Sequence, residues 1–479
     1  MVFAPLIKGG NRPLPLLVLE LAAIALLIMV ARDPARIRGH LSWAFLATLA
    51  LLVVGPLVQL VPLPQLLWES LPGREAYAAA LNAVGLEPSQ RTFSLLPRAT
   101  ESAWLALLPA VAVFLASVAL PDEKLKRAAQ VFIAMAVVQA LIGLAQFGTG
   151  SAAVLWEMDV LRDRSGIGTY ANRDHLAGLL EMALPLALAL LAARIIPGHR
   201  ASRNQRPAPM GRAIARMFSD GFKVDQVVLL GAASLVILLG LVFTRSRTGV
   251  ALGMFAILLC ALAFSRRLGG ERSVKLVSVV AVVGLALAVE IGLAPVLGRF
   301  TTEALIGDMR WSVYSGTISG IGEFFPLGSG FGTYPEVFRR FQPADVPTFV
   351  NHAHNDYLEW LFEGGVVAAI LIVAFAAFYV RRWPQLWVGQ RWSQLRFLQV
   401  AAGISLLLLS LHGLVDFNLH IPANAIYFAF LAGVFFHREE EVAQPKRKVR
   451  APVARPPEPP AVQEPSPPPL DNQSNPFAD

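Results

Sequence analysis

The sequence predicts an all-α membrane protein, a polytopic transmembrane helical bundle of about eleven or twelve spans with one large outer loop. Hydrophobic residues make up 55% of the 479 residues and charged residues only 15%, which is too apolar for a soluble protein of this length. Apolar runs of membrane-spanning length recur along the chain, and basic residues collect in alternate connections between them. From these observations we expect lipid to surround most of the protein.

Eleven apolar runs approach the roughly 20 residues that a helix needs to cross about 30 Å of hydrocarbon. They lie at 14–31, 41–61, 101–120, 128–147, 175–197, 225–243, 249–265, 275–297, 363–381, 397–414 and 421–437. An odd number of spans followed by a cytoplasmic tail places the N-terminus outside. The alternative is a first helix that is truncated or that begins upstream of this Met.

Basic residues indicate the orientation of these runs. They form the clusters Arg32, Arg36 and Arg38; Lys124, Lys126 and Arg127; Arg200 to Lys223; Arg266, Arg267 and Arg272; Arg381, Arg382 and Arg391; and Lys446, Arg447 and Lys448. By the positive-inside rule these segments are cytoplasmic, so 62–100, 148–174, 244–248, 298–362 and 415–420 lie outside. The net charge of +8 is therefore an orientation signal, and no nucleic-acid partner is expected.

Two segments differ from the apolar runs. The outer loop 298–362 carries aromatic residues, glycines and turn signals (FPLGSGFGTYPEVF, 325–338), and a loop of this length in a compact fold is usually functional. Residues 438–479 are rich in proline and charge and poor in apolar residues, which predicts a disordered cytoplasmic tail. The expected organisation is a transmembrane domain over 1–437 followed by this tail.

Arginines supply the first candidate site. In TRSRTG (244–249), Arg245 and Arg247 stand at the outer junction of two apolar runs. A single arginine at a span end commonly extends its charge to the membrane interface. Two of them in so short a connection instead favour a bidentate grip on phosphate oxygens. Arg310, in GDMRWSVYSG (307–316), lies in the outer loop and taken alone is an ordinary loop charge.

The motif NHAHNDYLEWLFEGG (351–365), at the start of a span, supplies the second candidate site. Asp356 and Glu359 have the spacing of a capping box, which is a structural role. His352 and His354 face the outer aqueous side, and histidine is the commonest general base. A zinc site of His-x-His with carboxylates is the weaker alternative, because cysteine partners and a standard metalloenzyme spacing are missing. No metal and no cofactor are expected.

Two further polar clusters flank apolar runs, and polar residues at such depth are costly unless they face a protein cavity. One contains Asn172, Asp174 and His175, and the other His412, Asp416 and His420. These residues are equally compatible with two roles, which are lining a cavity inside the protein and capping helices. The chain has no Asp-x-Asp pair, so the sequence does not predict a nucleotide sugar held through a divalent metal ion. It has no P-loop either, so ATP binding is not predicted.

Three of these motifs, in this order, resemble the signature of the O-antigen ligase superfamily, which includes Wzy-type polysaccharide polymerases and protein O-oligosaccharyltransferases. They are R-x-G at 247–249, Arg310 followed by an aromatic residue and PLGSGFGTY, and HAHNDYLEWLFEGG, and the resemblance covers roughly 160–437. It implies a metal-independent membrane glycosyltransferase of lipopolysaccharide or exopolysaccharide biosynthesis. Such an enzyme moves a glycan from an undecaprenyl-diphosphate carrier to a hydroxyl at the periplasmic face of the inner membrane.

The resemblance also implies roles for residues. Arg247 and Arg310 would hold the diphosphate, and His354 would be the base, because it directly precedes Asn355 as in the family pattern. The acceptor stays open among a lipid A core, a carrier-linked glycan and a protein hydroxyl. We expect membrane lipids to surround the protein. The residues expected to contact the substrate are Arg245, His352, Asn355, Asn172, His412 and Asp416.

A secondary transporter or flippase is the alternative from another functional class. Glu20, Glu181 and Glu290 within apolar runs favour it, since transporters carry charges near the bilayer midplane. Most charges instead crowd the outer ends of the runs, and no internal repeat is visible. A non-catalytic assembly subunit is a third option, and it depends on the Pro-rich tail alone.

Overall fold

The computed structural model describes residues 1–85, 90–150, 165–195, 226–268, 303–388 and 392–439, together with Ser466. The chain divides into two units, Met1–Glu439 and Glu440–Asp479, and all the described helices belong to the first. The expected span at 275–297 lies outside the described residues, and so does the expected Pro-rich tail apart from its first two residues and Ser466.

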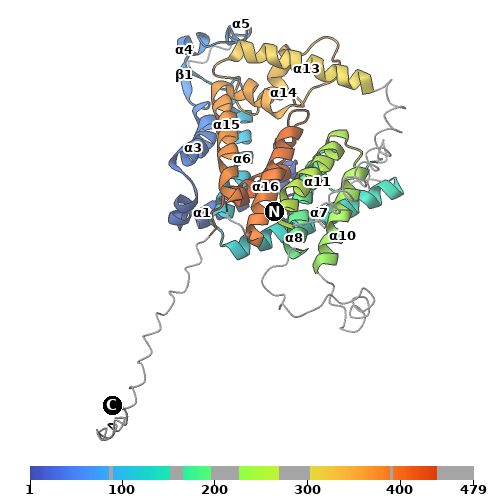
Figure 1. Ribbon diagram of the computed structural model, residues 1–479. Coiled ribbons are helices and arrows are strands. Elements are labelled where there is room, and N and C mark those ends of the chain that lie inside the picture. The colour runs from blue at the N-terminus through green and yellow to red at the C-terminus, as the bar shows by residue number, and fades with distance from the viewer. Residues whose placement is uncertain are drawn as a thin grey trace, which may run out of the picture. The chain divides into compact units, whose positions relative to one another are not determined.

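The first unit is a helical bundle (Figure 1). Its larger helices are α1 (Pro13–Ala31), α3 (Trp43–Val58), α6 (Pro97–Ala119), α7 (Asp122–Thr149), α8 (Arg173–Ile195), α10 (Gln226–Phe243), α11 (Arg247–Leu268), α15 (Asp356–Trp387), α16 (Gln394–His412) and α17 (Pro422–Phe436). Over the described ranges eight helices are long and apolar enough to cross a membrane, or nine if α3 and the bent helix before it count as one span. The predicted polytopic helical bundle is therefore confirmed.

The remaining elements connect these helices. They are α2 (Pro34–His40), α4 (Gln65–Glu69), α5 (Glu75–Ala83), α13 (Glu303–Phe324), α14 (Tyr334–Val337), the 3-10 turns η1 (Lys8–Gly10), η2 (Phe338–Arg340) and η3 (Asn418–His420), and the strands β1 (Pro62–Pro64) and β2 (Gln90–Thr92). The two strands pair antiparallel, with Leu63 opposite Arg91. In Figure 1, α4, α5, α13 and α14 gather at one end of the bundle.

The core of the bundle forms around α8 and α16. Both helices are buried on nearly all sides, which is the pattern of a helix that is apolar all round and surrounded by other helices. The Ser405 hydroxyl of α16 donates to the Met182 carbonyl oxygen of α8 over 2.7 Å, a contact typical of helix pairs in membranes. The outer helices instead expose large apolar side chains, such as Leu21 on α1 and Val373 on α15. These faces fit a lipid environment.

Basic residues lie together at the end of the bundle where α15 and α17 finish. His437 contacts Asp122 at the start of α7 over 2.9 Å, and its carbonyl oxygen accepts a hydrogen bond from Arg382 of α15. Arg396, near the start of α16, pairs with Glu439. At the opposite end, α8, α11, α15 and α17 begin and α16 finishes. The polar motifs 172–175, 245–247 and 352–356 are therefore at the other end from these basic residues.

The expected outer loop is largely helical within its described part, 303–362, since it contains α13 and α14. Its aromatic residues form a small core of their own beside the start of α15. The side chains of this core include Phe324, Tyr334, Phe338, Phe362, Val313 and Val350. Packing of these side chains explains why the segment is ordered although its sequence has the composition of a loop.

Glycines allow the turn 325–332 to lie against α15. The helix is broken at Gly365, whose φ is +51°, and a Cβ there would lie 2.1 Å from the carbonyl oxygen of Pro326. Gly328 has φ +82°, and a Cβ on it would lie 2.2 Å from the carbonyl oxygen of Glu363. Only glycine tolerates both the backbone conformation and such close approach. The short first part of α15 is thereby held against the turn.

The orientation of the bundle can be tested with reporter fusions. We expect reporters inserted within 198–224, 381–395 or the tail to act in the cytoplasm, and reporters within 298–362 to act outside, because the basic clusters alternate. Paired alkaline phosphatase and green fluorescent protein fusions measure the two locations. A fluorescent, phosphatase-inactive fusion within 298–362 would overturn the predicted orientation.

Candidate functional site

The site forms where the segment 350–355 meets the connection 413–421 between α16 and α17. Asn355 caps α15, because its Oδ1 accepts hydrogen bonds from the backbone N–H groups of Tyr357 and Leu358, both over 3.0 Å. Its Nδ2 donates to the carbonyl oxygen of Leu414 over 2.9 Å. The expected capping box at Asp356 is wrong by one residue, since Asn355 is the extended residue and Asp356 is already helical.

His354 is held between two elements. Its backbone φ is +52°, a region that few residues other than glycine adopt, and its carbonyl oxygen accepts a hydrogen bond from the Tyr314 hydroxyl over 2.8 Å. Its Nδ1 lies 3.5 Å from Oδ1 of Asp416, which is ion-pair range. The ring meets Phe417 edge-on at 5.1 Å between centroids. With 39% of its side chain exposed, His354 remains open to a ligand.

Asp416 is the buried charge of this site, with 3% of its surface exposed. Besides His354, it has His175 Nε2 at 3.9 Å and Asn418 Nδ2 at 3.5 Å from its Oδ2. Burial on its own would raise the pKa of Asp416, but the neighbouring histidines, His354 first among them, lower it to about 2. The carboxylate is therefore ionised at neutral pH and orients the imidazole beside it.

Helix α13 carries Arg310 one turn before a residue that contacts the His354 segment. Arg310 lies four residues before Tyr314, so the two side chains share one face of the helix. The Tyr314 hydroxyl is the group that binds the His354 carbonyl oxygen, as described above. The spacing of Arg310 and Tyr314 was visible in the sequence, but nothing there indicated that the tyrosine contacts the histidine segment.

The motif TRSRTG forms the turn between α10 and α11. Ser246 caps α11, because its hydroxyl oxygen accepts the backbone N–H of Gly249 over 3.1 Å. Arg245 has φ +58°, and its guanidinium lies 5.7 Å from the centre of the Phe147 ring. Arg247 is the first residue of α11, and both arginines are exposed. The turn therefore presents two guanidinium groups at the end of the bundle that carries the histidines.

Close packing joins this turn to the helix that carries His175. A Cβ on Gly249 would lie 2.4 Å from the Ala177 side chain, so the beginnings of α11 and α8 are in contact. Ala177 is two residues beyond His175, which is the residue that approaches Asp416. Helix α11, which begins with Arg247, therefore packs against the start of α8. The start of α8 in turn carries His175, which approaches Asp416.

Asn172 and His412, two of the expected substrate contacts, are engaged within the fold. Asn172 Oδ1 accepts the backbone N–H of Asp174 over 3.0 Å at the start of α8. His412 is 1% exposed, and its Nδ1 lies 3.0 Å from an oxygen of Glu181, itself fully buried in α8. Their contacts give both residues a structural role, and substrate contact by either stays a prediction.

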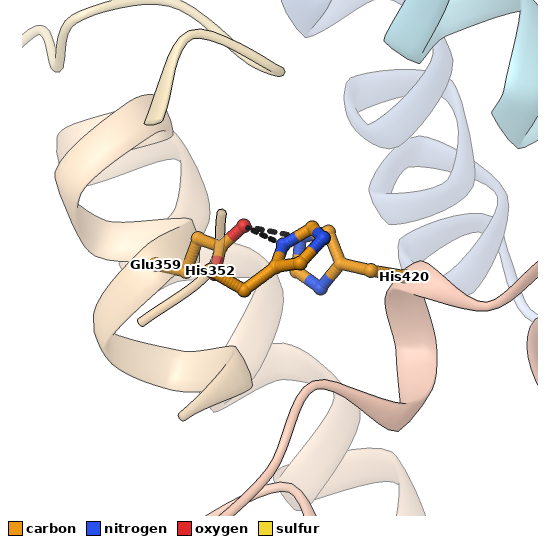
Figure 2. A group of neighbouring side chains, drawn as sticks. All are labelled: His352, Glu359 and His420. Carbon is orange, nitrogen blue, oxygen red and sulfur yellow. Dashed lines mark hydrogen bonds and ion pairs between the residues drawn. The ribbon is translucent and has the colours of Figure 1, made fainter. Parts of the chain in front are cut away.

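A second cluster joins His352 to Glu359 of α15 and to His420 of the connection 413–421 (Figure 2). His352 Nδ1 lies 2.8 Å from Oε1 of Glu359, and His420 Nε2 lies 3.2 Å from the same oxygen. His420 Nδ1 contacts Oδ1 of Asp356 over 2.9 Å. Burial lowers the pKa of His420, but Glu359 and Asp356 outweigh it and raise the pKa to about 10. Among the described residues, His352, Glu359 and His420 form the one group with the spacing of metal ligands.

An apolar cavity of about 410 Å³ lies beside this cluster. It is bounded by α3, α6, α15, α16 and α17, and Asp356, Tyr357 and Leu419 are its lining residues nearest the site. Aromatic side chains line much of the rest, among them Phe45, Phe114, Phe375 and Phe428. The cavity therefore extends from the polar end of the bundle into the part that is apolar.

Comparison with known families gives one match. Residues 232–373 match the family model described as O-antigen ligase. This segment contains Arg245, Arg247, Arg310 and His354, whereas Asp416 and His420 lie beyond it. Neither the curated proteins nor the solved structures contain a significant match. The family match supports the superfamily that the three motifs predict.

The buried contact between His412 and Glu181 should contribute strongly to stability. His412→Ala leaves a buried carboxylate without its partner, so we expect a loss of roughly 3–5 kcal/mol in the free energy of unfolding. Thermal unfolding of the purified protein in detergent measures the effect. The control is Arg339→Ala, which removes an exposed ion pair with Glu336 and should unfold close to wild type. Equal unfolding temperatures for the two variants would contradict the structural role of His412.

Proposed function

We propose that this chain, a member of the O-antigen ligase superfamily, transfers a glycan from an undecaprenyl-diphosphate carrier to an acceptor hydroxyl at the periplasmic face of the inner membrane. The observation that carries the proposal is the arrangement at His354, which lies beside the buried, ionised Asp416 and is bound by Tyr314 from the helix of Arg310. The basic end of the bundle then faces the cytoplasm, and the site faces the periplasm.

His354 acts as the general base. Because Nδ1 faces Asp416, a proton on Nδ1 leaves the Nε2 lone pair available for the acceptor. The acceptor hydroxyl gives its proton to Nε2 while its oxygen bonds to the anomeric carbon of the donor sugar. The bond from that carbon to the diphosphate oxygen breaks in the same step. Asp416 stabilises the imidazolium that results, which is the role of the carboxylate in other His–Asp pairs.

Arg247 and Arg310 bind the diphosphate. Negative charge increases on the departing oxygen as its bond to the sugar breaks, so donors already in place stabilise the transition state more than the ground state. Guanidinium groups suit this task because each binds two phosphate oxygens and stays charged in a partly desolvated site. Arg245, stacked over Phe147, adds positive charge at the same turn. The transfer step proposed here uses these side chains alone.

The apolar cavity supports a lipid-linked donor. Its lining is almost entirely apolar, and its polar lining residues include Asp356, two residues beyond His354. An isoprenoid chain can lie along such a surface while its diphosphate stays at the polar end of the bundle. The acceptor can be a lipid A core, a second carrier-linked glycan or a protein hydroxyl, since each offers the oxygen that the base requires.

Glu181 was one of three carboxylates that favoured a transporter from sequence. In the structure it is the buried partner of His412 and lies between α8 and α16. This contact accounts for a carboxylate within an apolar run by helix packing. The proposal of a transferase rests on the polar end of the bundle, where the motif residues converge.

Removal of either arginine tests the leaving-group role. We expect Arg247→Ala and Arg310→Ala each to lower the transfer rate by about 10²-fold or more, the scale for one preorganised donor. Arg→Lys should recover little activity, because an ammonium group cannot reproduce a bidentate contact. The measurement is transfer of a lipid-linked glycan by purified protein. Arg339→Ala is the control, since Arg339 is an exposed arginine of the same outer segment that pairs with Glu336. Wild-type rates in both site variants would refute the role.

Removal of the base tests the proton-transfer step separately. His354→Ala should lower transfer by roughly 10²–10⁴-fold while the protein still binds the lipid-linked donor, because the base acts only on the acceptor. Product formation and donor binding are measured on the same preparation. His40→Ala is the control, as His40 stacks on His437 at the opposite end of the bundle. The mechanism fails if His354→Ala transfers the glycan as fast as wild type.

A further inference from the structure

We propose that His352, Glu359 and His420 bind a divalent cation of the zinc class at a site separate from the transfer centre. The proposal revises the expectation from sequence that the chain holds no metal. It goes beyond the proposed function and does not rest on it, because the binding of a metal ion is measured without any substrate. Its basis is the position of the three ligand atoms, the groups that hold them in place and the charge around them.

The ligand atoms converge on one point (Figure 2). Oε1 of Glu359 lies 2.8 Å from Nδ1 of His352 and 3.2 Å from Nε2 of His420, and all three atoms lie within 4.8 Å of one another. In a tetrahedral zinc site with bonds of about 2.0–2.1 Å, neighbouring ligand atoms are about 3.3 Å apart. A zinc ion therefore needs only small movements of these side chains to bind.

Groups behind the ligands hold them in orientations suited to a metal. Nδ1 of His420 contacts Oδ1 of Asp356 over 2.9 Å, which directs Nε2 towards Glu359. Zinc-bound histidines commonly donate their other ring N–H to a carboxylate in this way. The second oxygen of Glu359 accepts the backbone N–H of Ala353 over 2.8 Å. The ring of His352 stacks on Phe417, with 4.1 Å between centroids.

The charge of the surroundings favours a cation. Asp356 and Glu359, which contact the proposed ligands, are buried at 3% and 1% exposure, and a buried ionised carboxylate requires a positive or polar partner. With no metal bound, the His420 ring meets this requirement through its contacts with Asp356 and Glu359. A zinc ion bound by Nε2 would leave Nδ1 of His420 in contact with Asp356.

The position of the site indicates what the metal would do. His352 belongs to the segment 350–355, which carries His354, and His420 belongs to the connection 413–421, which carries Asp416. A metal ion bound by both would fix the two segments, and hence the base and its carboxylate, relative to each other. Three protein ligands also leave a fourth position for a water molecule. The metal is a positioning element in this proposal and takes no part in the bond-breaking step.

Metal analysis of the purified protein tests the site. The chain is expressed with an affinity tag that lacks histidine and purified in detergent without added metal or chelator. We expect about one zinc per chain by mass spectrometry of the elements. After removal of the metal, Co²⁺ should bind with the visible absorption of a tetrahedral site. Glu359→Gln and His420→Asn should lose both signals, whereas His354→Asn, a histidine outside the ligand set, should retain them.

Two results would overturn the proposal. The first is wild-type protein that contains less than about a tenth of an equivalent of zinc and takes up no Co²⁺. The three residues would then form ion pairs only and bind no metal. Full metal content in Glu359→Gln and His420→Asn would place the metal elsewhere. If these variants do not fold, the wild-type measurements decide. A metal-loaded but inactive His354→Asn would support both proposals, and an active one would refute only the proposed base.

Discussion

The polar end of the protein depends on one constraint, the burial of an ionised carboxylate at Asp416. A charge removed from water is stable only when positive or polar groups surround it. His354 comes to Asp416 from the start of α15, His175 from the start of α8 and Asn418 from the same connection. Segments far apart in sequence are therefore required to meet at this point. The site is assembled by the cost of leaving Asp416 unpaired.

The fold could be predicted from sequence where it depends on apolar length alone. Each expected apolar run except 275–297 coincides with a described helix, because the thickness of hydrocarbon sets the length of a span. The outer segment was less predictable, since α13 and α14 are stabilised by a small aromatic core between distant residues. The sequence pattern indicated Asp356 as the N-cap of α15, whereas the structure has Asn355 in that position. Asp356 also fits the capping pattern, and only its contact with His420 explains why it turns inward.

The candidate site was predicted in part. The structure places His354 beside Asp416 and links the helix of Arg310 to it, but the roles of these residues in transfer stay predictions. The sequence could not indicate that His420 meets Glu359, because 61 residues separate them and no spacing rule connects a helix start with a later turn. Similarly, nothing in the sequence paired His412 with Glu181, since that contact depends on how α8 and α16 pack.

The break in α15 at Gly365 has a consequence for the way the protein sits in a bilayer. The residues before the break are bound to the turn 325–332, because Ser329 and Gly330 donate backbone hydrogen bonds to Phe362 and Glu363 over 3.0 Å. Just beyond the break, Val366 donates a backbone hydrogen bond to the Pro326 carbonyl oxygen over 2.8 Å, and the rest of the span continues through the bundle. A change in membrane thickness alters the tilt of a span through hydrophobic mismatch. Because a helix can change direction at such a break, we expect the segment with the histidines, which the turn 325–332 holds, to move less than the span when membrane thickness changes.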